Sequence, residues 1–241
     1  ISTQVGCPMG CVFCATGQMG FERSLSAGEI LAQVLHFMRK LRAEGQSLTN
    51  IVYMGMGEPF LNYEATLQSV HRLIDPQGLN FGARRITIST VGIISKIEQF
   101  TEESLQVNLA VSLHTANNDL RSQLVPANRM FPLQQLISAC KAYTEKTHRR
   151  ITFEYALIDG VNDSREAALQ LAGLLKGMLC HVNLIALNPS KKYALKGSSR
   201  EKVQAFSAAL EEHGIPVTVR LRRGVEIQAG CGQLASAEKS A

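Results

Sequence analysis

The sequence lacks any apolar run long enough to span a membrane, and it does not open with the basic and apolar segments of a secretory signal. It also lacks the cysteine pattern of a secreted disulfide framework, because three of its 6 cysteines are crowded into one loop and the others, Cys140, Cys180 and Cys231, are far apart. These absences exclude a membrane protein and a small disulfide-stabilised domain. We expect a soluble protein in the reducing cytoplasm.

No stretch rich in Gly, Pro or Ser divides the 241 residues, and no segment repeats another. Hydrophobic residues make up 45% of the chain, which is enough for a substantial core, so we expect a single domain. The net charge of +5 is modest for this size and permits a polyanionic partner without indicating one. The chain begins at Ile1 rather than Met, and we expect it to be a fragment or a trimmed chain.

Apolar segments of strand length alternate with amphipathic segments of helix length along most of the chain. Strands are predicted at 1–5, 50–54, 85–89, 107–112, 150–157, 182–186 and 216–220, and helices at about 24–44, 63–74, 94–100, 132–146, 164–175 and 200–212. Alternation of this kind requires a parallel sheet with helices outside it. The predicted fold class is therefore α/β, and the repeated units could close a full barrel or remain an open one.

Three cysteines, Cys7, Cys11 and Cys14, follow the first predicted strand with the spacing C-x3-C-x2-C. A tetrahedral zinc site needs a fourth ligand, and none lies close by, whereas a cubane iron–sulfur cluster can be held by three thiolates with one iron left open. An open iron can chelate a small molecule. This spacing, with the aromatic Phe13 just before the last cysteine, resembles the radical S-adenosylmethionine (SAM) enzymes. Zinc and three core cysteines are the alternatives.

Polar or glycine-rich residues follow several of the predicted strands, and in parallel barrels the reactive groups gather at these ends. They are Gly57-Glu58, Ser89-Thr90, Ser112-Leu113-His114 and Asn188-Pro189. Each has a local structural reading, such as a tight turn at Gly57 or a hydrogen-bonded structural histidine at His114. Taken together with the cysteines, they also offer the dispersed donors and acceptors that an amino acid–nucleoside cofactor requires.

Several longer strings carry a closer resemblance that covers nearly the whole chain. They are Gln4-Val-Gly-Cys7, Cys14-Ala-Thr-Gly17, Met54-Gly-Met-Gly-Glu-Pro59, Arg85-Ile-Thr-Ile-Ser-Thr90, Ser112-Leu-His114, Gly160-Val-Asn-Asp-Ser164 and Ala229-Gly-Cys-Gly-Gln-Leu234. The chain resembles the RlmN/Cfr family of radical SAM RNA adenine methyltransferases. The resemblance implies a partial (β/α)6 TIM-like barrel over 1–220, a C-terminal loop and tail over 221–241, and the absence of the family's N-terminal RNA-binding domain.

The same resemblance implies the cofactors and their ligands. Cys7, Cys11 and Cys14 would hold a [4Fe–4S] cluster whose open iron chelates SAM, and reductive cleavage of SAM would give a 5′-deoxyadenosyl radical. The residues that would contact SAM are Gly57, Glu58, Ser89, Ser112, Leu113, His114 and Asn188. An electron donor such as flavodoxin or ferredoxin is implied, and we expect a monomer.

A further cysteine, Cys231, would be methylated by one SAM and converted by the radical from a second SAM into the group that attacks the base. The chain departs from the family at Gln228-Ala-Gly230, where a pair of alanines usually precedes the cysteine. The family's second, resolving cysteine would lie one residue before Ile1, and its general base lies further upstream. Cys140 and Cys180 are interpreted as core residues instead.

The substrate implied is C2 of an adenosine in 23S rRNA, and also in tRNA, because Gly57-Glu-Pro-Phe-Leu-Asn62 and Leu184-Ile-Ala-Leu-Asn-Pro189 look more like the C2-methylating branch than the C8-methylating one. Two basic clusters could meet RNA phosphates: Arg220, Arg222 and Arg223, and Lys191, Lys192 and Lys196. The alternatives are C8 methylation, the same radical chemistry on another substrate, and a non-catalytic RNA- or metal-binding module.

Overall fold

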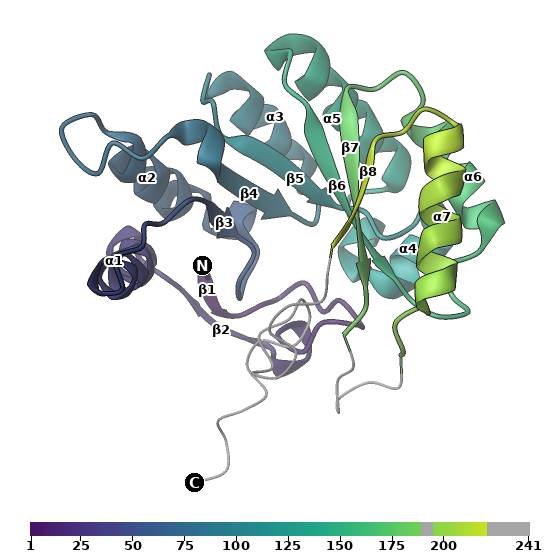
Figure 1. Cartoon of the computed structure of the whole chain (residues 1–241), viewed down its shortest axis with the longest axis horizontal. Coiled ribbons are helices and arrows are strands. Elements are labelled where there is room, and N and C mark those ends of the chain that lie inside the picture. Colours follow the sequence, from purple (N-terminus) through teal and green to yellow (C-terminus); the bar gives the residue numbers. More distant parts are fainter. Residues whose placement is uncertain (189–194, 221–241) are drawn as a thin grey trace, which may run out of the picture.

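The computed structural model describes residues 1–188 and 195–220 (Figure 1). In this part of the chain six strands form a parallel sheet in sequence order: β3 (Ile51–Tyr53), β4 (Ile86–Thr90), β5 (Asn108–Ser112), β6 (Ile151–Leu157), β7 (Cys180–Ala186) and β8 (Val217–Arg220). Each strand thus pairs with the next one along the chain, which is the topology of a singly wound barrel. The predicted α/β partial barrel is confirmed, and β3 and β8 are its two open edges.

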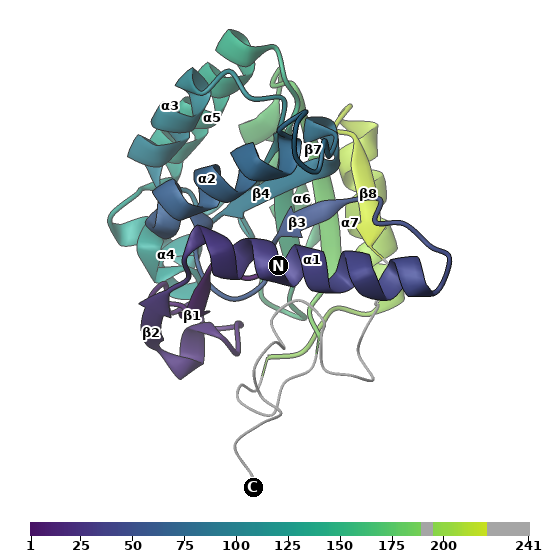
Figure 2. The same ribbon diagram turned by 90° about the vertical axis from the view of Figure 1, so that its left-hand side faces the viewer.

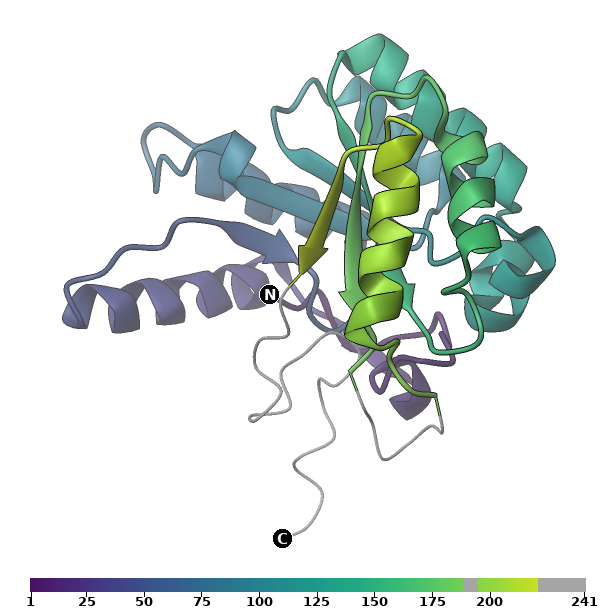
Figure 3. The same ribbon diagram turned by 45° about the vertical axis from the view of Figure 1, so that its right-hand side comes forward.

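Seven α-helices of the described residues connect and cover these strands, and they lie outside the sheet (Figures 1 and 3). They are α1 (Ala27–Ala43), α2 (Tyr63–Ile74), α3 (Ile94–Glu102), α4 (Asn118–Leu124), α5 (Leu133–Thr147), α6 (Arg165–Leu175) and α7 (Arg200–Glu212). The sequence pattern predicted six of them and did not predict α4, which is too short to show a period. Its start is set locally, because the Asn117 side chain accepts a hydrogen bond from the Leu120 amide at 2.9 Å.

Helix α1 was predicted to begin at about residue 24, and it begins at Ala27 after a capping box. The Ser26 hydroxyl accepts from the Glu29 amide at 3.3 Å, and the Glu29 carboxylate accepts from the Ser26 amide at 2.9 Å. Both bonds satisfy amides that have no partner inside the helix. The helix then turns Ile30 and Val34 into the core.

The prediction that residues 1–5 form the first strand of the parallel sheet is wrong. Strand β1 (Gln4–Gly6) pairs antiparallel with β2 (Phe21–Ser24), in a separate two-stranded sheet below the main one (Figure 2). Residues 7–20 return the chain so that β2 runs antiparallel beside β1. The two segments approach closely at Gly6, which has φ +77° and whose added Cβ would lie 2.0 Å from the Gly20 oxygen. The segment still lies along the edge of the sheet, since Gly55 donates to the Ile1 carbonyl at 3.0 Å and Thr3 donates to the Met56 carbonyl at 2.9 Å.

The strands present apolar side chains to the helices and mainly polar side chains to the barrel interior. On the helix-facing side, residues such as Ile88, Val111, Phe153 and Leu184 are fully buried. On the other side, the alternating positions include the apolar Val52, Ala110, Ala156 and Ile185, but most are polar: Thr87, Ser89, Asn108, Ser112, Thr152, Glu154, His181 and Asn183. The main core therefore lies between sheet and helices, and the barrel interior is hydrophilic.

The two isolated cysteines outside the loop are core residues. Cys140 on α5 and Cys180 at the start of β7 are buried in the main core, as their interpretation from the sequence required.

None of the helices in the described residues is both long and apolar enough to cross a membrane.

Candidate active site

The cysteine loop between β1 and β2 packs against the carboxyl ends of the central strands. Cys11 and Phe13 are buried together with Leu124, Ile158 and Leu187, which lie at or beyond the ends of α4, β6 and β7. The Val12 amide donates to the Leu124 carbonyl at 3.1 Å, and the Phe13 ring meets the His114 ring edge-on at 4.7 Å between centroids. The loop thus closes the end of the barrel toward which β7 and β8 point (Figure 1).

The three loop thiols influence one another electrostatically. Burial, together with negative charge on Glu58 and Cys14, raises the pKa of Cys7 to about 11, although a hydrogen bond with the Met9 backbone lowers it. Burial raises the pKa of Cys11 as well, with contributions from Cys14 and Cys7. Iron binding at such thiols must therefore release protons.

The donor set fits an iron–sulfur cluster: three thiols come from one loop, and Cys7 and Cys14 are half-buried while Cys11 is buried. As the side chains are placed, no group of three or more Cys, His, Asp or Glu among the described residues could hold a metal ion, so the fit is one of donor type and number and not of position.

Gly57 and Glu58 follow β3 and contact the segment before the cysteine loop. Gly57 has φ +100°, and an added Cβ would lie 2.6 Å from the Gln4 Cβ, so the close approach requires glycine. The Gln4 side-chain oxygen accepts from the Glu58 amide at 2.9 Å. The turn therefore holds Glu58 beside the cysteines, which goes beyond the tight turn that the sequence alone suggested.

The Glu58 carboxyl is buried and held by two amides, from Phe60 at 3.0 Å and from Val91 at 2.8 Å. Burial raises its pKa to about 7, against the lowering effect of these hydrogen bonds and of Thr90. Because its charge raises the pKa of both Cys7 and Cys11, the carboxyl lies within electrostatic reach of the loop. It can accept a hydrogen bond from an amino group bound there.

Residues 112–114 leave β5 at the same end of the barrel. The amides of Leu113 and His114 donate to the Glu154 carbonyl at 3.0 and 3.4 Å. His114 has φ +63°, and its Nδ1 accepts from the Ala156 amide at 3.0 Å, which places the proton on Nε2. The hydrogen-bonded structural histidine that the sequence allowed is present, and its Nε2–H remains as a donor.

The free energy of unfolding should fall on acidification, because His114 is neutral in the folded protein. Burial and the nearby Arg121 lower its pKa from 6.5 to about 3, so between these pH values the unfolded chain binds more protons than the folded one. This contribution to the free energy of unfolding is present above about pH 6.5 and is lost as the pH falls toward 3. Urea unfolding over this range should show a shallower pH dependence for His114→Gln, whereas the exposed control His36→Gln should keep the wild-type slope. Equal slopes in all three proteins would contradict the assignment.

Arg121 on α4 was missed by the sequence reasoning, yet it is fully buried beneath the site. Its guanidinium donates to the Val91, Ser112 and Leu113 carbonyls at 2.7, 3.0 and 3.2 Å, and to the Asn128 Oδ1 at 2.8 Å. Burial lowers its pKa to about 10, while the Cys11 and Cys140 thiolates would raise it. Arg121 thus ties together the ends of β4 and β5 next to the cysteine loop.

Asn162, which lies in the string Gly160-Val-Asn-Asp-Ser164, and Glu154 were not predicted as site residues. The Asn162 amide donates to the His114 and Ala156 carbonyls at 2.7 and 2.8 Å, so it fixes the chain around His114. Glu154 lies beside Ser112 in the sheet, and its Oε1 accepts from Asn183 at 2.9 Å. An acidic residue at an inward position of an otherwise apolar strand was the available signal for Glu154.

The structure brings all seven predicted SAM contacts to one end of the barrel. Gly57-Glu58, Leu113-His114 and the buried Asn188 follow β3, β5 and β7, and Ser89 and Ser112 lie on the inward side of β4 and β5 near their ends. Other predicted residues lie outside the described ranges: Pro189, Lys191, Lys192, Arg222, Arg223, Gln228 and Cys231. Lys196 and Arg220 are described, and both are exposed.

Residues 1–172 match the family model of the Radical SAM superfamily. The chain is also 53% identical over 234 residues to a protein named "Probable dual-specificity RNA methyltransferase RlmN" from Caldanaerobacter subterraneus, covering 97% of this chain and 67% of that protein. The chain belongs to the RlmN family of the radical SAM superfamily. Membership of this family argues against the two alternative interpretations of the cysteine loop, a zinc site and three core cysteines.

Other relatives agree with the RlmN assignment. "Dual-specificity RNA methyltransferase RlmN 1" from Myxococcus xanthus is 53% identical over 234 residues, covering 97% of this chain and 65% of that protein. The crystal structure of a radical SAM methyltransferase from Sphaerobacter thermophilus is 56% identical and superposes with a TM-score of 0.95, over 97% of this chain and 68% of that one. The chain therefore spans about two thirds of the length of its RlmN relatives.

Proposed function

We propose that this chain is the catalytic core of a radical SAM methyltransferase that methylates C2 of an adenosine in 23S rRNA and in tRNA. The observation that carries the proposal is the closure of the C-x3-C-x2-C loop over the barrel end where Glu58, His114 and Asn188 are buried. The high identity to RlmN relatives supports RNA as the substrate. Preference for C2 over C8 rests on the resemblance of residues 57–62 and 184–189 to the C2-methylating branch.

Each predicted ligand has a role that its surroundings permit. Cys7, Cys11 and Cys14 would hold a [4Fe–4S] cluster, which when bound supplies the electron that cleaves SAM. Glu58 would accept from the SAM amino group, since its oxygens are already oriented by two amides. The other residues proposed to hold SAM are Gly57, Ser89, Ser112, Leu113, His114 and Asn188, and His114 would donate from Nε2.

Cys231 would carry the methyl group to the base, and an electron-transfer protein such as flavodoxin or ferredoxin would reduce the cluster of the monomeric enzyme. The methyl group is first placed on a cysteine sulfur because C2 of adenine is electron-poor and does not react with an ordinary electrophilic methyl group. The exposed Lys196 and Arg220 would meet RNA phosphates near this end of the barrel.

Mass spectrometry of RNA from cells with and without the gene tests the reaction. Deletion should remove 2-methyladenosine from 23S rRNA and tRNA, and the wild-type gene should restore it. An unchanged content, or a change in 8-methyladenosine instead, would contradict the proposed position.

The role of Cys231 can be tested by measuring RNA methylation and SAM cleavage by the protein separately. Cys231→Ala should abolish RNA methylation, while the reconstituted, reduced protein still releases 5′-deoxyadenosine from SAM. The matched control Cys180→Ala changes a buried core thiol at the start of β7 and should retain both activities. Methylation by the Cys231→Ala protein would remove this cysteine from the mechanism.

A further inference from the structure

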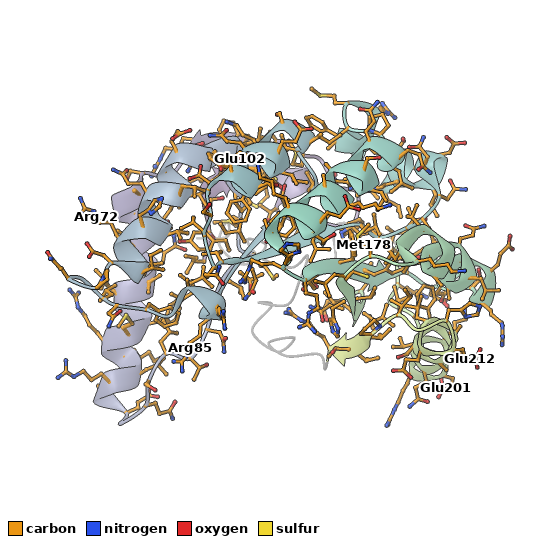
Figure 4. All side chains as sticks on the ribbon, turned by 90° about the horizontal axis from the view of Figure 1, so that it is seen from above. Arg72, Arg85, Glu102, Met178, Glu201 and Glu212 are labelled. Atoms are coloured by element: carbon orange, nitrogen blue, oxygen red, sulfur yellow. The ribbon has the colours of Figure 1, made fainter. Side chains whose placement is uncertain are left out.

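A second polar site lies at the opposite end of the barrel from the cysteine loop, where the strands begin. It is a cavity of about 490 Å³, termed the amino-end cavity, lined by Thr87, Asn108, His148, Arg149, Arg150, Thr152, His181 and Asn183. Figure 4 looks down on this end, with Arg85 beside the start of β4 and Met178 in the loop before β7. Every lining side chain can form hydrogen bonds, and none is a carboxylate.

Strand alternation explains why these side chains meet. Ile151 and Phe153 of β6 are fully buried on the helix side, so Arg150, Thr152 and Glu154 take the inward positions. Thr152 pairs with His181 in the sheet, and Glu154 pairs with Asn183. The inward faces of β4 and β5 add Thr87 and Asn108 at the same end.

Arg149 is held in place by neutral partners. Its guanidinium donates to the Gln106 Oε1 at 2.8 Å and to the Asn108 Oδ1 at 2.9 Å. Among the described residues neither Arg149 nor Arg150 forms an ion pair with a carboxylate. The cavity therefore contains two guanidinium charges without a matching anion, and one of them is already oriented.

The charge of Arg150 acts on His181 in the wall of the amino-end cavity. Burial lowers the pKa of His181, and the charge of Arg150 lowers it further. Glu154 lies two residues beyond Thr152 on β6, and its carboxylate accepts a hydrogen bond from Asn183. Burial raises the pKa of Glu154, which disfavours its charged form. An anion entering from the mouth thus meets the arginines before it approaches this carboxyl.

We propose that the amino-end cavity is a binding site for a phosphate group, held by Arg149, Arg150 and the hydroxyls of Thr87 and Thr152. A phosphate offers only acceptors to these donors, and guanidinium groups match its geometry. The phosphate belongs either to the RNA backbone or to a free phosphate ester. The site is separate from the proposed SAM site and does not depend on radical chemistry.

Isothermal titration of the reconstituted protein with inorganic phosphate and with adenosine 5′-monophosphate tests the site. Arg150→Gln should raise the Kd about tenfold, on the scale of one charge-assisted hydrogen bond. Arg72→Gln is the matched control, because Arg72 is exposed on the outer side of α2, away from the cavity (Figure 4). Absence of binding, or equal effects of the two substitutions, would overturn the proposal.

A parallel titration with substrate RNA at several salt concentrations identifies the source of the phosphate. If it is the RNA backbone, Arg150→Gln should weaken RNA binding and reduce the slope of log K against log salt by about 1. If it is a free ester, RNA binding should be unchanged while the monophosphate Kd rises. Release of 5′-deoxyadenosine, measured on the same samples, should not respond to Arg150→Gln, so failure of this site and failure of the proposed function can be told apart.

Discussion

Cys11→Ala is expected to abolish cluster binding and, with it, all release of 5′-deoxyadenosine from SAM. Cys11 is the most buried of the three loop thiols, and the loop packs around it with Phe13 and Leu124. Two remaining thiols cannot hold a cubane that needs three protein ligands. Iron and sulfide content per chain, the visible absorption of the reconstituted protein and 5′-deoxyadenosine release should all fall to background.

The matched control is Cys140→Ala, which removes the same sulfur from a fully buried position on α5. It should lower the free energy of unfolding by creating a small cavity, but it should leave the iron content at the wild-type level. Cys11→Ala should also create a small cavity, but unlike Cys140→Ala it should lose the iron. A Cys11→Ala protein that binds iron and cleaves SAM normally would refute the ligand assignment.

Arg121→Met is expected to destabilise the fold strongly. It leaves three backbone carbonyls and the Asn128 side chain without their buried donor. Each unsatisfied buried group costs about 1–3 kcal/mol, so the total approaches the whole stability of an ordinary domain, about 5–15 kcal/mol. Urea unfolding should show a loss of at least about 3 kcal/mol, on the scale found when buried charge networks are broken.

Arg129→Met is the control, because this arginine is exposed in the short 3-10 helix after α4 and should change stability by less than about 0.5 kcal/mol. Arg121→Lys keeps the charge but not the planar fork, so it should recover only part of the loss. Equal stability of Arg121→Met and wild type would show that the four hydrogen bonds contribute nothing.

Arg121 also connects stability to iron binding. Its guanidinium has no carboxylate partner among the described residues, and the Cys11 thiolate would raise its pKa. A buried cation is costly without a nearby negative charge, so deprotonation of the thiols on iron binding should relieve that cost. The gain in melting temperature on cluster reconstitution should therefore be smaller in Arg121→Met, which removes the charge, than in Arg121→Lys, which keeps it.

Local chemistry made much of this molecule predictable. The helix predicted at 63–74 is observed with the same bounds, because its apolar period and its ends depend on nearby residues. The capping box at Ser26 is local for the same reason. The spacing of Cys7, Cys11 and Cys14 likewise predicted a shared ligand loop, since ligands in one loop must be close in space.

Contacts between distant segments decided the rest. The pattern of residues 1–5 predicted a strand but not its partner, which is β2, antiparallel to it and close to it at Gly6 and Gly20. The buried position of Arg121 was not predicted, because its neighbours in sequence do not reveal that carbonyls at the ends of β4 and β5 surround it.

The sequence by itself determined the α/β alternation, the helix starts and the cysteine loop, because spacing along the chain encodes each of them. Only the tertiary structure decided that His114 is neutral, with Nδ1 bound to the Ala156 amide, and that Arg149 and Arg150 line one cavity at the other end of the barrel. The physical reason is that desolvation and charge compensation depend on which side chains surround a group. Those neighbours come from strands far apart in sequence, and the closing of the barrel brings them together.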